Sequence, residues 1–435
     1  MGSSPNRRSL VLVGSLAGLL VTVGVLAGCT AAPDTESMRF DATFTANTNG
    51  GLNGAGSSVA VQTDGKIIVT GSFTKAGGTS APRIARFNTD GTPDTSFNAS
   101  TNGGLNKAGH SVAVQTDGKI IVTGSFTKAG GTSAPRIARF NADGTPDTAF
   151  NASTNGGLTD KGWSEPSKRS IDPGMVIPPS GNSVAVQPDG KIVVTGGFNL
   201  AGGATANGIA RFNADGTPDT SFIKMTNGGL DSLGGNSLAV QPDGKIIVAG
   251  GFSEAGGMTS SLVARFEADG RPDVRFIVNF ADRPEAGYGS GSSVALQPDG
   301  KIIITGSFMT THGAPGDRIA RIDSDGAPDV RFASNTYGGL NGAYFAGFAV
   351  ALQPDGKIVV TGDFNKAGGI PTNNVARFNA DGTPDSNFNE NNGGLNGMGY
   401  SVAIQPDGGI VLTGSFTTEN GAPGNRIARL SPGPG

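Results

Sequence analysis

Reactive side chains are scarce in this chain of 435 residues. It contains one cysteine, two histidines and one tryptophan, and only 15% of its residues are charged. A single cysteine excludes an internal disulfide and a metal site built from several thiolates. His110 and His312 stand apart among small residues, and the chain has neither a nucleophile elbow nor a glycine-rich loop that leads into a helix. We therefore expect no catalytic residue, no metal and no cofactor.

Basic charge is also in short supply. The chain has 32 basic and 35 acidic residues, and removal of residues 1–28 would leave 30 basic ones. Lys and Arg form no continuous stripe, which argues against a nucleic acid partner.

The first 28 residues have the features of a signal peptide. Arg7 and Arg8 precede an apolar stretch, and Leu26-Ala27-Gly28-Cys29 resembles the lipobox of bacterial lipoproteins. The resemblance implies cleavage before Cys29 and its acylation, with palmitate among the acyl chains, which would anchor the protein in a membrane. A plain secretory signal and a single membrane span are the alternatives, and the two arginines also fit a twin-arginine signal. We expect a signal peptide at 1–28, a tether at 29–38 and an extracytoplasmic fold at 39–435, on the cell surface or in the periplasm.

One segment recurs seven times along the rest of the chain. Each copy has an apolar stretch, the turn Gln-Pro-Asp-Gly-Lys or a close variant, a second apolar stretch and an Ile-Ala-Arg-Phe-like stretch. The first residues of the seven turns are Gln62, Gln115, Gln187, Gln241, Gln297, Gln353 and Gln405. The 72 Gly and 25 Pro residues recur at fixed places, so they punctuate turns rather than signal disorder.

The second copy illustrates the expected unit. Its strands are 111–115, 119–126 and 136–140, and Asp147-Thr148-Ala149-Phe150 reads as a fourth short strand. No helical periodicity appears in the mature chain. Four short strands repeated seven times predict an all-β fold, a seven-bladed β-propeller of four-stranded antiparallel blades.

The two ends of the chain predict how the ring closes. Seven Ile-Ala-Arg-type segments and seven Asp-x-x-Phe segments occur, yet the chain ends just after the last of the former. The missing fourth strand is Phe40–Phe44 at the N-terminus. We therefore expect the N-terminal strand to complete the last blade, which also covers two open sheet edges. An open solenoid is the alternative.

The repeat, with its Pro-Asp-Gly-Lys turn and Ala-Asp-Gly-Thr-Pro-Asp tail, resembles the delta-60 repeat family of bacterial β-propellers from Phe40 to Leu430. The resemblance implies a propeller and an extracytoplasmic setting, and it implies no reaction.

Charged residues that occur in every copy are expected to be structural. Arg86 can pair with Asp94, and Arg139 with Asp147, across one turn. A ring of charge that binds a ligand is the alternative. The turn 141–147 resembles a calcium loop only loosely, because Gly144 occupies a ligand position.

Aromatic residues outside the repeat are the candidate binding residues. Apart from Phe40 at the entry strand, these residues fall in the connectors between blades: Trp163, Phe280, Tyr288, Tyr337, Tyr344, Phe345, Phe348 and Tyr400. Variable loops on a rigid scaffold are where binding usually resides. We therefore select Trp163, Tyr288, Tyr337, Tyr344 and Tyr400 as ligand-binding candidates, with the longest connector, 159–182, as their centre. The alternative is that the aromatic side chains fill gaps between blades, which we expect for Phe345 and Phe348.

Together these features predict a monomeric, lipid-anchored binding or scaffolding module for a protein or a glycan. The alternative is a propeller hydrolase or lyase that acts on extracellular polysaccharide, which would need at least two acidic or His groups to converge near the propeller axis.

Overall fold

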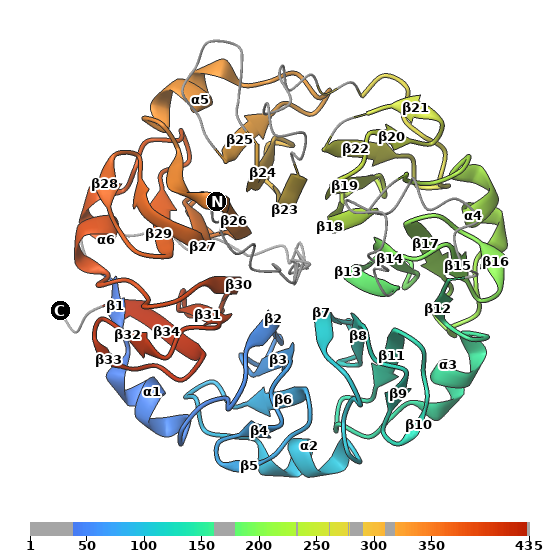
Figure 1. Cartoon of the computed structure of the whole chain (residues 1–435), viewed down its shortest axis with the longest axis horizontal. Coiled ribbons are helices and arrows are strands. Elements are labelled where there is room, and N and C mark those ends of the chain that lie inside the picture. Colours follow the sequence, from blue (N-terminus) through green and yellow to red (C-terminus); the bar gives the residue numbers. More distant parts are fainter. Residues whose placement is uncertain are drawn as a thin grey trace, which may run out of the picture.

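The computed structural model describes residues 38–160, 179–231, 234–260, 262–276, 278, 290–308 and 318–432, without the side chains of residues 343–346. Within them, seven antiparallel sheets, one per repeat, stand like blades around one axis, and short helices lie at the periphery (Figure 1). The observed fold is thus the predicted all-β propeller.

Each blade has an inner, a middle and an outer strand, and blades 1 to 7 follow the chain. The inner strands are β2 (Gly56–Val61), β7 (Gly109–Val114), β13 (Ser180–Val186), β18 (Gly235–Val240), β23 (Ser290–Leu296), β26 (Leu340–Leu352) and β30 (Gly399–Ile404). The middle strands are β3 (Ile67–Gly71), β8 (Ile120–Gly124), β14 (Ile192–Gly197), β19 (Ile246–Gly250), β24 (Ile302–Ser307), β27 (Ile358–Ala367) and β31 (Ile410–Gly414). The outer strands are β6 (Ile84–Phe87), β11 (Ile137–Phe140), β17 (Ile209–Phe212), β22 (Val263–Phe266), β25 (Ile319–Ile322), β29 (Val375–Phe378) and β34 (Ile427–Pro432).

Small strands extend the loops between middle and outer strands. These strands are β4 (Lys75–Ala76), β5 (Thr79–Ser80), β9 (Lys128–Ala129), β10 (Thr132–Ser133), β15 (Leu200–Ala201), β16 (Ala204–Thr205), β20 (Glu254–Ala255), β21 (Met258–Thr259), β28 (Ile370–Pro371), β32 (Thr418–Glu419) and β33 (Ala422–Pro423). Two further strands lie in other segments, β1 (Met38–Phe40) and β12 (Leu158–Thr159), which pairs with β15.

The two ends of every blade differ. Inner and middle strands are joined by the repeated turn, in which the Gln62 amide donates to Lys66 O at 2.8 Å and Gly65 adopts φ 80°. The outer strand ends on this side as well, and we call it the turn side. Inner strands begin on the opposite side, where the connectors from the preceding blade arrive, and we call it the connector side.

The predicted fourth strand is wrong, because the Asp-x-x-Phe segment forms a short helix in the described part of six blades. The helices are α1 (Ala42–Asn47), α2 (Thr95–Ser100), α3 (Thr148–Ser153), α4 (Thr220–Met225), α5 (Val330–Asn335) and α6 (Ser386–Asn391). Each described blade therefore has three main strands, to which blade 7 adds β1, while the short β28 joins the sheet of blade 6. In blade 4, Asp273 begins a turn, and residues 277–289, except 278, lie outside the described residues.

The physical reason is N-capping. In blade 1, Asp94 Oδ1 accepts the amide of Phe97 at 3.1 Å, as an N-cap carboxylate does at the first turn of a helix. Pro93 forms the last bridge, to Phe87, and has no amide with which to continue a ladder. Phe97 is fully buried and anchors the helix to the blade.

The other oxygen of the same carboxylate binds arginine. Arg86 Nε and Nη2 both lie 2.9 Å from Asp94 Oδ2, and Lys66 Nζ lies 3.3 Å from it. The Arg86 guanidinium also covers the Phe97 ring, 4.2 Å from its centroid. Blade 2 repeats this arrangement with Arg139 2.9 Å from Asp147. Each pair joins an outer strand to a helix rather than two strands of a ladder.

Arginine also connects neighbouring blades on the turn side. Arg86 Nη1 donates to Ala142 O of blade 2 at 2.7 Å, and Arg139 Nη1 donates to Ala214 O of blade 3 at 2.6 Å. The inner strands are connected in a similar way, because the Val112 amide donates to Ser58 Oγ of the preceding blade at 3.2 Å. Adjacent blades are therefore held at both the rim and the axis.

Blade 7 takes its last elements from the N-terminus. Strand β1 pairs antiparallel with β34, with Phe40 opposite Leu430, and α1 follows at once. Asp41 Oδ2 accepts Arg429 Nη2 at 2.5 Å, so the ion pair of blade 7 joins residues 388 positions apart. The predicted strand Phe40–Phe44 is correct only at Phe40, because Asp41 caps α1 as Asp94 caps α2.

We predict that Asp41→Ala destabilises the protein by about 1–3 kcal/mol, through loss of a helix cap and a charge-assisted hydrogen bond. Asp94→Ala is the matched control, since it removes the same contacts within one blade. Denaturant unfolding measures both, and hydrogen exchange should show new exposure of β1 and β34 in Asp41→Ala alone. Equal protection of these two strands in both variants would contradict a special role of the N-terminal segment.

A buried carboxyl group lies beside this junction. Glu419 on β32 is 2% exposed and accepts a hydrogen bond from the Thr45 hydroxyl of α1. Its counterparts in other blades are alanines such as Ala76 and Ala129. Burial raises the pKa of Glu419 to about 7, the Thr45 hydrogen bond opposes this rise, and the charge of Asp41 adds to it.

We predict that the native state loses stability as the pH rises to about 7. Between pH 4.5 and 7 the Glu419 carboxyl is ionised in the unfolded chain but protonated in the native protein, so each rise in pH favours the unfolded chain. The loss between pH 5 and pH 8 should be about 2 kcal/mol. Glu419→Ala, which restores the residue of the other blades, should remove this dependence. Thermal unfolding across this pH range measures it, and a parallel loss in the variant would contradict it.

Candidate functional site

The inner strands carry one position at which the blades differ in chemistry. It follows the first repeated glycine of each inner strand, at the connector end of the strand. The inner strands lie closest to the axis (Figure 1). We call these residues the inner belt: Ser57, His110, Asn182, Asn236, Ser292, Phe348 and Tyr400.

Each belt residue is a β-bulge. The register between inner and middle strands shifts there in all seven blades, for example between Gly109 and Ser111 and between Gly399 and Ser401. The bulged residue has no partner in the ladder, so its side chain can change without disturbing strand pairing. The preceding glycine is required, since a Cβ at Gly399 would lie 1.6 Å from Thr361 Oγ1 of blade 6.

The asparagines of the belt are used within the scaffold. Asn182 Nδ2 donates to Gly235 O of blade 4 at 3.2 Å, and Asn236 Nδ2 donates to Ser290 Oγ of blade 5 at 2.7 Å. Both side chains therefore join adjacent blades, and their donors are engaged.

His110 belongs to β7, which begins two residues before the expected strand 111–115. Its Nε2 lies 3.2 Å from Ser125 Oγ, at the end of the middle strand. Burial lowers the pKa of His110 to about 4, although Gly181 and Asn182 of blade 3 act to raise it. The imidazole is thus neutral at neutral pH.

The aromatic members of the belt meet at the junction of blades 6 and 7. The rings of Phe348 and Tyr400 pack edge to face with centroids 5.7 Å apart, and both side chains are partly exposed. Tyr400 Oη points to Met398 Sδ at 3.8 Å, and Met398 is 36% exposed. Full burial was expected for Phe348, and its partial exposure leaves an accessible aromatic pair.

The strand register brings an acidic residue near Phe348. Asp363 follows Gly362, which pairs with Gly347 just before Phe348, and it occupies the position that Ser125 has beside His110 in blade 2. Among the side chains that the structure describes, none donates a hydrogen bond to the Asp363 carboxylate. The junction therefore combines an aromatic pair with a carboxylate.

The predicted binding residues do not form one group. Tyr400 lies in the inner belt, whereas Tyr337 follows α5 at the periphery, where it is 67% exposed and adopts φ 47° in a position occupied by Asn102 in blade 2. Trp163, Tyr288, Cys29, Phe280 and His312 lie outside the described residues, as do the side chains of Tyr344 and Phe345.

Sequence reasoning missed that His110 and Phe348 occupy equivalent positions of the inner strands of blades 2 and 6, and that Asp363 follows the middle-strand glycine that pairs just before Phe348. The available signal was the strand pattern Gly-x-Ser-Val-Ala-Val, in which only the second residue changes from small to aromatic between copies.

The turn side presents a different chemistry. The turn 141–147 is an ordinary Asx turn, in which Asp143 Oδ1 accepts both the amide and the hydroxyl of Thr145 at 2.9 and 2.7 Å. Asp147 is engaged by Arg139 and the Phe150 amide. Among the described residues, no cluster of His, Cys, Asp or Glu is arranged to hold a metal.

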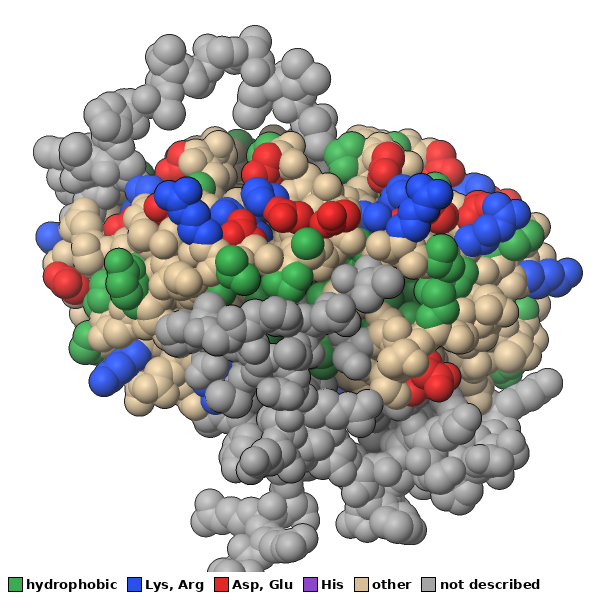
Figure 2. All heavy atoms as spheres, turned by 90° about the horizontal axis from the view of Figure 1, so that it is seen from above, with side chains coloured by type: hydrophobic (Ala, Val, Ile, Leu, Met, Phe, Trp, Pro, Cys, Tyr) green, Lys and Arg blue, Asp and Glu red, His purple; other side chains and the backbone are tan. Residues whose placement is uncertain are grey.

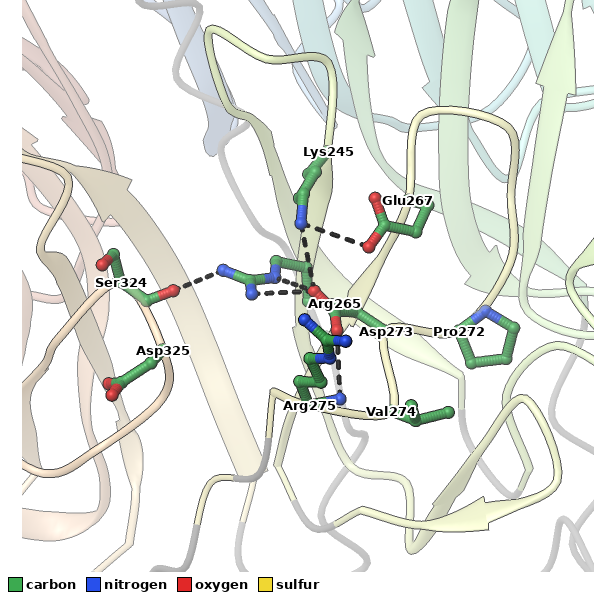
Figure 3. A pocket seen from close by; sticks show the side chains of 9 residues that line it. All are labelled: Lys245, Arg265, Glu267, Pro272, Asp273, Val274, Arg275, Ser324 and Asp325. Carbon is green, nitrogen blue, oxygen red and sulfur yellow. Dashed lines mark hydrogen bonds and ion pairs between the residues drawn. The ribbon is translucent and has the colours of Figure 1, made fainter.

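A pocket of about 440 Å³ opens on this side between blades 4 and 5. Its walls carry both signs of charge, and Lys245 and Arg265 are already paired with Asp273 (Figure 3). The lining residues are Lys245, Arg265, Glu267, Pro272, Asp273, Val274, Arg275, Ser324 and Asp325. The pocket thus extends the repeated ion-pair arrangement.

Comparison with known proteins places the chain among propellers. The model of the family described as "Domain of unknown function (DUF5122) beta-propeller" matches residues 62–97, 115–150, 187–222, 241–276, 297–332, 353–388 and 405–433, more than half of the chain. No curated protein matches the sequence. Among the described residues, no helix is long and apolar enough to span a bilayer.

Similar solved structures include the WD40 propeller domain of Doa1, with 13% identity, a TM-score of 0.49 and coverage of 91% of this chain and 96% of that one. A streptogramin B lyase shows 14% identity and a TM-score of 0.41, with 91% and 96% coverage. The extracellular domain of the putative hybrid two-component system BT3049 from B. thetaiotaomicron shows 12% identity and a TM-score of 0.45, with 88% and 40% coverage.

We predict that His110→Asn, which copies Asn182 and Asn236, keeps the fold and improves tolerance of mild acid. The pKa of His110 is lower in the native protein than in the unfolded chain, where it is 6.5. As the pH falls from 6.5 towards about 4, the unfolded chain gains a proton that the native imidazole does not, so the native protein loses stability. Unfolding free energies at pH 7 and pH 4.5 measure the effect. An equal loss of stability in the variant and the natural protein would show that His110 does not carry it.

Proposed function

Because the chain belongs to the DUF5122 β-propeller family, whose repeats supply a rigid scaffold, we propose that it is a lipid-anchored, extracytoplasmic, non-catalytic module that binds a neutral glycan. The observation that carries the proposal is the junction of blades 6 and 7, where Phe348 and Tyr400 replace the small or polar belt residues of other blades. The site is the partly exposed pair together with Asp363.

The chemistry of this junction suits a sugar ring. Aromatic rings offer apolar area to the C–H groups of a pyranose, and Tyr400 adds a hydroxyl at the edge. The Asp363 carboxylate can accept hydrogen bonds from sugar hydroxyls, and these charge-assisted bonds are stronger than neutral ones. The same negative charge disfavours an anionic polysaccharide.

A glycan fits better than a protein partner because the described apolar surface is small and scattered. The large exposed apolar residues belong to different blades, except that Val330 and Tyr337 both lie at α5. These residues are Met225, Val274, Val330, Tyr337 and Met398. A stable protein interface usually buries about 800 Å² on each partner around a cluster of such residues. Only Met398 lies beside the aromatic pair.

The remaining parts of the proposal come from sequence. Acylation of Cys29 would provide the anchor, and Trp163, Tyr288 and Tyr344 stay binding candidates on the sequence alone. Extracytoplasmic location follows from the signal peptide and the lipobox-like Leu26–Cys29.

We predict that Phe348→Ser and Tyr400→Ser each weaken glycan binding at least tenfold without loss of fold, since Ser57 and Ser292 occupy the same belt position. Asp363→Ser, which copies Ser125, should weaken binding of neutral glycans and remove discrimination against acidic ones. Screening of the full-length lipidated protein in detergent against immobilised polysaccharides measures these effects.

Tyr337→Asn is the matched control, because it removes an exposed aromatic at the periphery and restores the Asn of other blades. It should leave binding unchanged. If glycan binding survives both belt substitutions, or if the protein binds no polysaccharide and only another protein, the assignment of a glycan site to this junction is wrong.

The alternative function, a hydrolase or lyase, has one observation in its favour. Ser125 Oγ and His110 Nε2 are 3.2 Å apart, the spacing of a nucleophile and its base. With a pKa of about 4, however, this imidazole is a poor base near neutral pH. His110 and Asp363 belong to different blades, 2 and 6, and no hydrogen bond or ion pair joins them among the described residues. Polysaccharide cleavage that is abolished by Ser125→Ala would favour this alternative.

A further inference from the structure

The direction of β1 determines from which side of the disc the membrane anchor leaves. Strand β34 runs from the connector side to the turn side, because its residue Leu430 pairs with Ile410, the first residue after the last repeated turn. Strand β1 is antiparallel to it, with Phe40 opposite Leu430 and Met38 opposite Pro432, beyond the end of the blade. The chain therefore enters the propeller at the turn side of blade 7.

The entry point is fixed and not loosely attached. Met38 is 3% exposed, and its sulfur accepts a hydrogen bond from Arg377 Nη1 of blade 6 at 3.2 Å. In blade 1 the equivalent donor, Arg86 Nη1, binds a turn carbonyl of the next blade, whereas Arg377 Nη1 binds Met38. The first described residue is thus packed between two blades.

Eight residues separate Cys29 from Met38. Whatever their arrangement, a chain of this length spans at most about 30 Å, at roughly 3.3–3.6 Å per residue. An anchor at Cys29 must therefore remain close to the turn side of blade 7.

We propose that the turn side faces the membrane and that the connector side, with the inner belt, points away from it. This orientation rests on the proposed anchoring through Cys29. It presents the Phe348–Tyr400 junction to polymers outside the membrane rather than to lipid.

The charge of the turn side agrees with a face that approaches headgroups without inserting. Figure 2 shows acidic and basic side chains gathered in a band along one edge of the disc. The turn lysines are paired with the capping aspartates, as Lys66 is with Asp94 at 3.3 Å. The turn aspartates, such as Asp64 and Asp243, remain exposed and would be repelled by anionic lipid. The tether, and not the face, then holds the protein to the bilayer.

Fluorescent labels on the two sides of blade 7 test the orientation. Pro406→Cys places a label on the exposed turn, where blades 1 and 2 have Thr63 and Thr116, and Ala422→Cys places one on the exposed loop of the connector side. The full-length lipidated proteins are incorporated into vesicles that contain a lipid with a nitroxide on its headgroup. We expect the label at 406 to be quenched several-fold more than the label at 422.

The result separates the orientation from the anchoring. Equal quenching at both positions, or stronger quenching at 422, would overturn the orientation. Failure of the lipidated protein to associate with vesicles, with the same behaviour as Cys29→Ser, would instead overturn the anchoring on which it rests.

Discussion

Each described blade holds a nearly buried arginine on its outer strand, and the rest of the ring is arranged around that charge. A guanidinium shielded from water needs a counter-ion and a partner for every donor. Asp94 neutralises Arg86 through Oδ2 and caps α2 through Oδ1, so one carboxylate determines both the ion pair and the helix. Arg86 Nη1 donates to a carbonyl of the next blade and to Gln62 Oε1 of its own blade. The same arginine therefore connects strand, helix and neighbouring blade.

This constraint explains how the two ends of the chain meet. In blades 1 to 6 the aspartate follows its arginine by eight residues, whereas in blade 7 the paired aspartate lies 388 positions before the arginine. The counter-ion of Arg429 is Asp41, which brings β1 and α1 to blade 7. Although burial opposes it, the Phe44 amide and Arg429 lower the pKa of Asp41, as equivalent contacts do for Asp94. The pKa is lowered in all seven aspartates of these ion pairs, whether their arginine is near or far in sequence.

The sequence predicts the scaffold well because its signals are local and repeated. Alternation, turn residues and the Arg–Asp spacing give the strands and the ion pairs. The helix was missed since a six-residue helix shows no 3.6-residue period, and Asp-x-x-Phe has the length of a short strand as well as the spacing of an N-cap. The inner belt was missed for a related reason. The expected inner strand of blade 2 starts at Ser111, one residue after the bulge, which excludes His110, and Phe348 is assigned to a connector between blades.

The bulge also explains how a site can arise in one blade of a nearly identical set. A residue outside the ladder can change without loss of strand pairing, whereas a change at the capping aspartate would affect a helix, an ion pair and a blade junction together. Blade 6 shows how far this freedom extends. Ala349 stands where the other inner strands have the serine whose hydroxyl binds the next blade, as Ser58 binds Val112. The contact between Phe348 and Tyr400 joins blades 6 and 7 at this point instead. At this junction an aromatic contact replaces the hydrogen bond that joins the other neighbouring blades. Both rings are partly exposed to solvent. The same pair of side chains can therefore join two blades and offer a binding surface.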